Sequence, residues 1–169
     1  AASDLRLITT ALKIVIPIDR TDLKAGGHSL FVEQKNYQET LRTAALYQAS
    51  GRIADAEAPL KLVVGQAKDA DSMIALADYY RTLRRDADAV AQLEKAAADP
   101  RAFGAATVRK ATILYAQGKK SEAYAAVDAV LKQDETETAA LVAKSQFLAQ
   151  DGKLDDGLAL AKKAASTNP

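Results

Sequence analysis

The 169-residue sequence contains no cysteine, no tryptophan and a single histidine, His28. Without cysteine the chain can form neither a disulfide framework nor a thiolate metal site, and it has no thiol nucleophile. His28 has no second histidine or cysteine with which to share a metal ion, so we expect it to be a solvated loop residue. We therefore predict no metal site.

The sequence also lacks an excess of charge of either sign. It has 23 Lys and Arg residues against 22 Asp and Glu residues, a net charge of +1, and the two signs are interspersed along the chain. This balance offers no electrostatic basis for binding nucleic acid or an anionic membrane. The most apolar stretch, residues 8–18, contains Lys13 and Pro17 and is shorter than the ~20 residues that a membrane-spanning helix needs. We expect a soluble chain with no direct membrane insertion, for which an exported or periplasmic location is slightly favoured over the cytoplasm.

Aromatic residues are scarce as well, and the common catalytic motifs are absent from the sequence. Aromatic residues make up 5% of the chain, whereas hydrophobic residues make up 49% and charged residues 27%. A core built mainly from Ala, Leu and Val favours closely packed helices over a β-sandwich. No phosphate-binding glycine motif, nucleophile elbow or paired-histidine zinc motif is present. We predict that the chain is not an enzyme, has no cofactor and takes no small-molecule substrate.

A short turn-like segment recurs along the chain at a nearly constant interval. Gly51, Gly118 and Gly152 each begin such a segment, and Arg84 occupies the same place between two amphipathic runs. The successive intervals are 33, 34 and 34 residues. A repeat of this length indicates stacked pairs of helices, because each pair can bury its apolar face only against its neighbours.

Side-chain size follows the same register. The side chains five residues after and seven residues before each turn residue are small, which allows helix axes to approach closely. A large apolar side chain, four residues before each turn residue, is expected to fill the groove between helices. In that order, the positions are Ala56, Ala89, Ala123 and Gly157; Ala44, Ala77, Ala111 and Ser145; and Tyr47, Tyr80, Leu114 and Leu148.

Over about residues 37–169, these features resemble the tetratricopeptide repeat (TPR) family. The resemblance implies an all-α, right-handed α-solenoid of about four stacked helix-turn-helix repeats, with a concave face lined by the first helix of each pair. We place the repeats at residues 37–69, 70–103, 104–137 and 138–169, in one continuous domain. The match is degenerate, because the tryptophan-like position of the family holds Thr40, Met73, Thr107 and Leu141 and its closing proline is present only as Pro169.

The first 36 residues do not follow the period. Apolar residues recur at helical spacing from Leu5 to Val15, which predicts an amphipathic helix over residues 3–16 that ends at Pro17. Because a solenoid end needs an atypical element to cover its core, we interpret residues 1–36 as an N-terminal capping helix and loop. The alternative is an edge left over from an upstream repeat.

Three residues bear on where the helices begin. Pro59 falls within the second helix expected for the first repeat, where it should kink that helix or delay its start. Asp71 and Ser121 are candidate N-cap residues for the helices that follow them.

A binding surface is the remaining functional candidate. If the TPR geometry holds, polar residues of the first helices line the concave face, and Arg and Tyr are the residue types that most often anchor interfaces. The expected partner-binding residues are Arg42, Asp78, Arg81, Arg109, Thr112, Tyr115 and Gln146. TPR proteins that grip acidic chaperone tails use Lys and Asn at groove positions that hold Leu41, Ala45, Ile74 and Asp78 here, so that clamp is not predicted.

We therefore predict a non-enzymatic scaffold that binds another protein or a peptide through the concave face of the solenoid. The alternative is a structural spacer or assembly segment of a larger complex, such as a bacterial secretion or envelope complex, with its contacts at the solenoid ends or on the convex face.

Overall fold

The computed structural model describes residues 39–40 and 42–167. The helix predicted at residues 3–16 and the loop that carries His28 lie outside these residues. Residues 39–40 and 42–49 are helical. The 3₁₀ helix η2 (Ile53–Ala56) follows, and then the α-helices α3 (Glu57–Ala67), α4 (Ala70–Thr82), α5 (Asp86–Ala96), α6 (Phe103–Ala116), α7 (Lys120–Gln133), α8 (Thr138–Gln150) and α9 (Leu154–Thr167).

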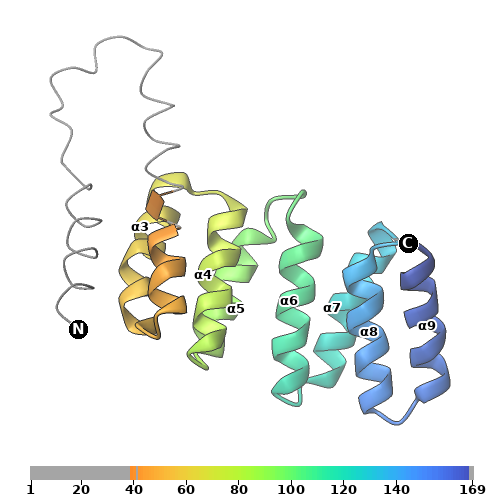
Figure 1. Cartoon of the computed structure of the whole chain (residues 1–169). Helices are drawn as coiled ribbons and strands as arrows, with labels where there is room; N and C mark the ends of the chain where they lie inside the picture. Colours follow the sequence, from red (N-terminus) through yellow and green to blue (C-terminus); the bar gives the residue numbers. More distant parts are fainter. Residues whose placement is uncertain (1–38, 41, 168–169) are drawn as a thin grey trace, which may run out of the picture. The chain divides into compact units, whose positions relative to one another are not determined.

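Consecutive helices pack side by side from α3 to α9 (Figure 1). In addition, α6 packs directly on α8, which brings the first helices of two successive pairs together. The described residues contain no strand. The predicted all-α solenoid is confirmed for this part of the chain. None of its helices combines the length and the apolar character that crossing a bilayer requires.

The predicted turn residues share one backbone conformation. Gly51, Arg84, Gly118 and Gly152 have φ angles of 76°, 59°, 80° and 80°, all in the left-handed region. The last three also share a hydrogen bond in which the amide of the next residue donates to the carbonyl oxygen five residues back, at 2.9 Å. This bond ends a helix in the Schellman arrangement, which requires a left-handed residue. The four residues that the sequence marked as turns thus share the left-handed backbone that such turns need.

Small side chains lie where the helices touch. Ala56, Ala77, Ala89, Ala111 and Ala123 are all fully buried. Each is too small to hold two helices apart, so the helix axes approach closely and the larger apolar residues interdigitate around them. The packing role that we inferred from the repeat is thus confirmed at these positions.

The buried apolar residues form two clusters that meet at α6. The first cluster extends from Ala44 to the Ala106 and Ile113 side chains of α6. The second cluster begins with Val108 and Ala111 on the same helix and continues to α8. Because α6 contributes to both clusters from different faces, it connects the two halves of the core.

Helix starts refine the local predictions. Pro59 lies in the first turn of α3, where its missing N–H has no helical partner, and α3 begins late, after the 3₁₀ turn of η2. The N-cap of α4 is Asp69, whose side chain accepts a hydrogen bond from the Ser72 amide at 2.7 Å. The prediction of Asp71 as this cap was therefore wrong.

The prediction for α7 was wrong as well. This helix begins at Lys120, so Ser121 lies inside it and no side chain caps its N-terminus.

Candidate functional site

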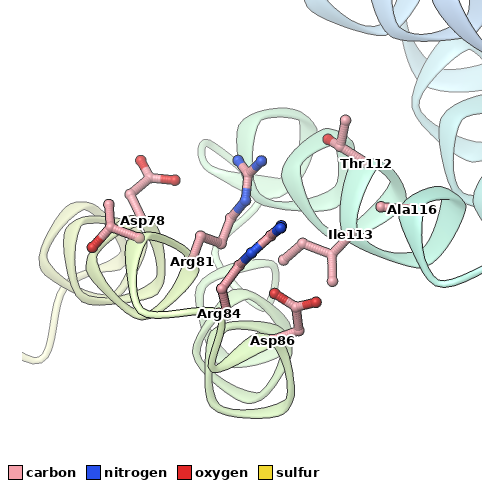
Figure 2. A pocket seen from close by; sticks show the side chains of 8 residues that line it. Asp78, Arg81, Arg84, Asp86, Thr112, Ile113 and Ala116 are labelled. Carbon is pink, nitrogen blue, oxygen red and sulfur yellow. The ribbon is translucent and has the colours of Figure 1, made fainter.

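A pocket of about 410 Å³ opens between α4 and α6. Figure 2 shows Arg81 and Arg84 extending from the end of α4 toward the side of the pocket that Thr112 and Ile113 form on α6. The complete lining is Asp78, Arg81, Thr82, Arg84, Asp86, Thr112, Ile113 and Ala116. The pocket thus joins the first helices of two pairs, and six of its eight lining residues are polar or charged.

The pocket exists because large aromatic residues are missing at this junction. At the junction of α6 and α8, the rings of Tyr115 and Phe147 stack with centroids 4.2 Å apart and an interplanar angle of 4°. Counted from the turn residues, the equivalent positions at the junction of α4 and α6 hold Arg81 and Ile113. A flexible guanidinium side chain and a smaller aliphatic one leave space that two stacked rings would fill.

An ion pair spans the two helices beside the pocket. The Arg109 Nε atom on α6 lies 3.2 Å from an Asp78 carboxylate oxygen on α4. Both side chains are partly exposed, so the pair contributes little to stability, but it holds the Asp78 carboxylate at one side of the opening.

The two arginines inside the pocket have no such partner. Within residues 39–40 and 42–167, no acidic group lies within ion-pair distance of Arg81 or Arg84, and neither side chain makes a hydrogen bond. Four of the other five arginines in this part of the chain are paired with carboxylates, and the exposed Arg42 is not: Arg52 pairs with Asp55, Arg85 with Glu57 and Asp88, Arg101 with Asp99, and Arg109 with Asp78. The pocket therefore presents two guanidinium groups whose donors are free for a ligand.

A second polar cluster lies at the junction of α6, α7 and α8. The Tyr115 hydroxyl is within hydrogen-bond distance of Asp151 Oδ1 (2.7 Å) and the Phe147 carbonyl oxygen (3.0 Å), while Tyr124 donates to Asp151 Oδ2 at 2.9 Å. Lys120 Nζ also donates to Asp151. These donors, Lys120 first, lower the pKa of Asp151 to about 2. Burial, together with the Asp151 carboxylate, raises the pKa of Tyr124 to about 12. Each of the four side chains thus has a partner within the protein.

The structure brings only some of the predicted binding residues together. Asp78, Arg81 and Thr112 line the pocket, and Arg109 borders it through its bond to Asp78. The remaining three lie elsewhere: Arg42 and Gln146 are exposed on other helices, and Tyr115 is 8% exposed, with its hydroxyl turned to Asp151.

Sequence reasoning missed Arg84, Asp86, Ile113 and Ala116 as pocket residues. A signal for Arg84 was available, because it alone replaces glycine at the recurring turn. No comparable signal marked the others, since the space around them depends on which helices face each other. In the described part of the chain, no group of three or more His, Asp or Glu residues could hold a metal ion.

Comparison with known proteins shows the type of fold. No protein-family model and no curated protein matches the sequence. The crystal structure of MamA is similar, with a TM-score of 0.61 and 19% identity over 82% of this chain and 81% of MamA. YrrB, a TPR protein with an unusual peptide-binding site, has a TM-score of 0.58 and 17% identity over 79% of this chain and 69% of its own. PilF of Pseudomonas aeruginosa has a TM-score of 0.65 and 19% identity over 80% of this chain and 63% of its own. The chain therefore has a TPR-like fold.

Proposed function

We propose that this chain is a TPR protein with repeats at residues 37–69, 70–103, 104–137 and 138–169, and that it is a non-enzymatic scaffold that binds another protein or a peptide. The observation that carries the proposal is the open pocket between α4 and α6, with unpaired charged groups at its wall. A stack of helix pairs offers a preorganised groove, which reduces the entropy lost when an extended segment binds. The peptide-binding site of the similar protein YrrB supports this type of ligand.

The pocket is the proposed centre of the site. The pocket offers three kinds of contact to one side chain of the partner: hydrogen-bond donors from Arg81, an acceptor from Thr112 and an apolar surface from Ile113. A pocket of this size, about 410 Å³, accommodates one side chain or a chain terminus and not a folded domain. We propose that the exposed residues Arg42 and Gln146 add contacts along the neighbouring first helices.

The first prediction tests this site by filling it. Ala116 is exposed at the end of α6 and lines the pocket, so Ala116→Trp should place an indole ring in the opening without disturbing the core. Peptides that bind the wild-type chain are first selected from a displayed library of random short peptides, and their affinities are measured by fluorescence anisotropy. We expect Ala116→Trp to abolish binding of most selected peptides.

The matched control is Ala125→Trp, which adds the same ring at an exposed position of α7. This variant should bind the selected peptides like the wild type. Equal binding by the Ala116→Trp variant would exclude the pocket as the site, and failure to select any peptide would contradict the proposed function itself.

A second function, assembly with other subunits, is favoured by α9. Leu154 and Leu158 on this helix are 67% and 54% exposed. At the position of Leu158, the earlier helices α5 and α7 have Val90 and Tyr124, which are partly covered by packing against the core. We propose that a further helix covers the exposed face of α9 when the chain acts as a spacer or assembly segment.

A further inference from the structure

Arg84 occupies a backbone position that favours glycine. Its φ angle of 59° lies in the left-handed region, where the equivalent turn residues of the other repeats are all glycine. In this region the Cβ atom of an L-residue crowds the following carbonyl oxygen, a contact that glycine avoids. The second repeat thus has a strained residue at a position where replacement of Arg84 by glycine would relieve the strain.

The left-handed backbone of Arg84 serves the turn that ends α4, but its side chain adds no contact to that turn. The Arg84 side chain makes no hydrogen bond or ion pair in the described part of the chain, and it extends into the pocket beside Arg81 (Figure 2). Glycine would close the same turn without strain, so the turn does not explain why arginine stands here. A guanidinium group that lines a pocket without an internal partner has its donors available to a ligand.

We propose that Arg81 and Arg84 together bind one carboxylate group of the partner segment, either an Asp or Glu side chain or a C-terminal carboxylate. This inference rests on the proposed function and specifies the ligand chemistry of the same pocket. Two adjacent guanidinium groups can bind both oxygens of a carboxylate through charge-assisted hydrogen bonds.

The acids of the pocket favour a singly charged ligand. Asp78 and Asp86 line the same pocket as Arg81 and Arg84, so the charges of the lining residues balance. In a pocket without net charge, the attraction of the arginines to a phosphate dianion is opposed by the repulsion of the acids, and the dianion must also lose a stronger hydration shell than a carboxylate does. Selectivity for carboxylate over phosphate is therefore part of the proposal.

The test uses small probes that need no knowledge of the partner. The full chain, labelled with ¹⁵N, is titrated with N-acetylalanine, which carries a terminal carboxylate, and with N-acetylglutamate N-methylamide, which carries a side-chain carboxylate. N-acetylglutamine N-methylamide is the neutral control, and inorganic phosphate is the dianion. We expect saturable shifts of the Arg81 and Arg84 Nε–H signals with both carboxylates, and the tighter of the two identifies the source.

The second prediction compares two exchanges to glycine. Lys68, the exposed C-cap residue of α3, is the other described non-glycine residue with a left-handed backbone, at φ 52°. Arg84→Gly and Lys68→Gly thus remove the same charge and the same kind of strain, and each should raise Tm by about 2 °C. Arg84→Gly should also weaken carboxylate binding by about tenfold, and Arg81→Gln should have the same effect. Lys68→Gly should leave carboxylate binding unchanged.

Several outcomes would overturn the inference: equal shifts with the neutral probe, tighter binding of phosphate than of carboxylate, or equal losses of affinity in the Arg84→Gly and Lys68→Gly variants. The selected peptides separate this inference from the proposed function. Suppose that the selected peptides fail to bind the Ala116→Trp variant but bind the Arg84→Gly variant normally. This result would refute carboxylate recognition and leave the proposed scaffold function intact. Binding of the carboxylate probes without any selected peptide would instead contradict the scaffold function.

Discussion

At the scale of single residues, the same repeat position serves different purposes. Tyr115 stacks on Phe147 and fills the junction of α6 and α8, whereas its equivalent Arg81 lines an open pocket between α4 and α6. An aromatic ring gains by burial, and a guanidinium group without an acidic partner gains by remaining accessible. One substitution between repeats therefore separates a position that fills the core from one that lines an open pocket.

The third prediction concerns Asp151, which accepts hydrogen bonds from Lys120, Tyr115 and Tyr124. Its pKa is lowered from 3.8 to about 2 in the folded protein, so the ionised carboxylate stabilises the fold above pH 3.8, and this contribution is lost as the pH falls toward 2. We expect Asp151→Asn to lower the free energy of unfolding at neutral pH. The difference from the wild type should shrink between about pH 4 and pH 2. Urea unfolding over a series of pH values measures it.

Asp155→Asn is the control, because Asp155 is exposed and makes no hydrogen bond or ion pair within the described residues. Its effect on unfolding should be much smaller than that of Asp151→Asn at neutral pH. A deficit of the Asp151→Asn variant that stays constant down to pH 2 would show that the carboxylate charge does not stabilise this junction.

At the scale of helices, the connections between elements differ in length. Two residues separate α3 from α4, whereas six residues, including Pro100, separate α5 from α6. The longer connection lies at the same repeat boundary as the pocket. A small residue five positions after each turn residue allows close contact between the helices of a pair. This residue is alanine in α5, in α7 and just before α3, and it is Gly157 in α9.

The fourth prediction tests the contact at Gly157. A Cβ atom added there would lie 2.9 Å from the Ser145 carbonyl oxygen, which belongs to the α8 backbone and cannot easily move. We expect Gly157→Ala to lower the free energy of unfolding by about 1–3 kcal/mol despite the better helix propensity of alanine.

Gly65 provides the matched comparison within a helix. A Cβ atom there would have no neighbour within 4 Å, so Gly65→Ala should raise the free energy of unfolding by about 0.5–1 kcal/mol. Chemical denaturation of both variants measures the two effects. Stabilisation of the protein by Gly157→Ala would show that α8 and α9 are not in such close contact.

At the scale of the whole described chain, the core forms two clusters joined through α6, and apolar surface remains open on α9. In a stack of helix pairs each helix is stabilised mainly by its neighbours. A helix with exposed leucines at the contact positions therefore retains a surface for one more neighbour.

The fifth prediction follows from that surface. If α9 mediates assembly between copies, light scattering should show a mass that rises with protein concentration for the wild type. Leu158→Glu should abolish this rise, because a carboxylate cannot be buried unpaired. Leu62→Glu changes a leucine of α3 that is 53% exposed and should leave the association unchanged. A wild-type chain that stays monomeric at all concentrations would contradict self-association through α9.

The sequence by itself determined the helical repeat and its register. A left-handed turn favours glycine, as at Gly118, and a close contact between two helices requires a small residue, as at Ala111. Each requirement acts on a single position, so these residues recur at regular intervals in the sequence. The N-terminal capping helix is still a prediction, since residues 1–36 lie outside the described part of the chain.

Only the tertiary structure decided where the solenoid is filled and where it is open. Tyr115 and Arg81 had the same standing in the sequence, as candidate interface residues on first helices. Their surroundings depend on the residues that face them from the next helix, Phe147 and Ile113, more than 30 positions away. Packing across such a distance is a property of the three-dimensional arrangement, because the volume left between two helices depends on the side chains of both.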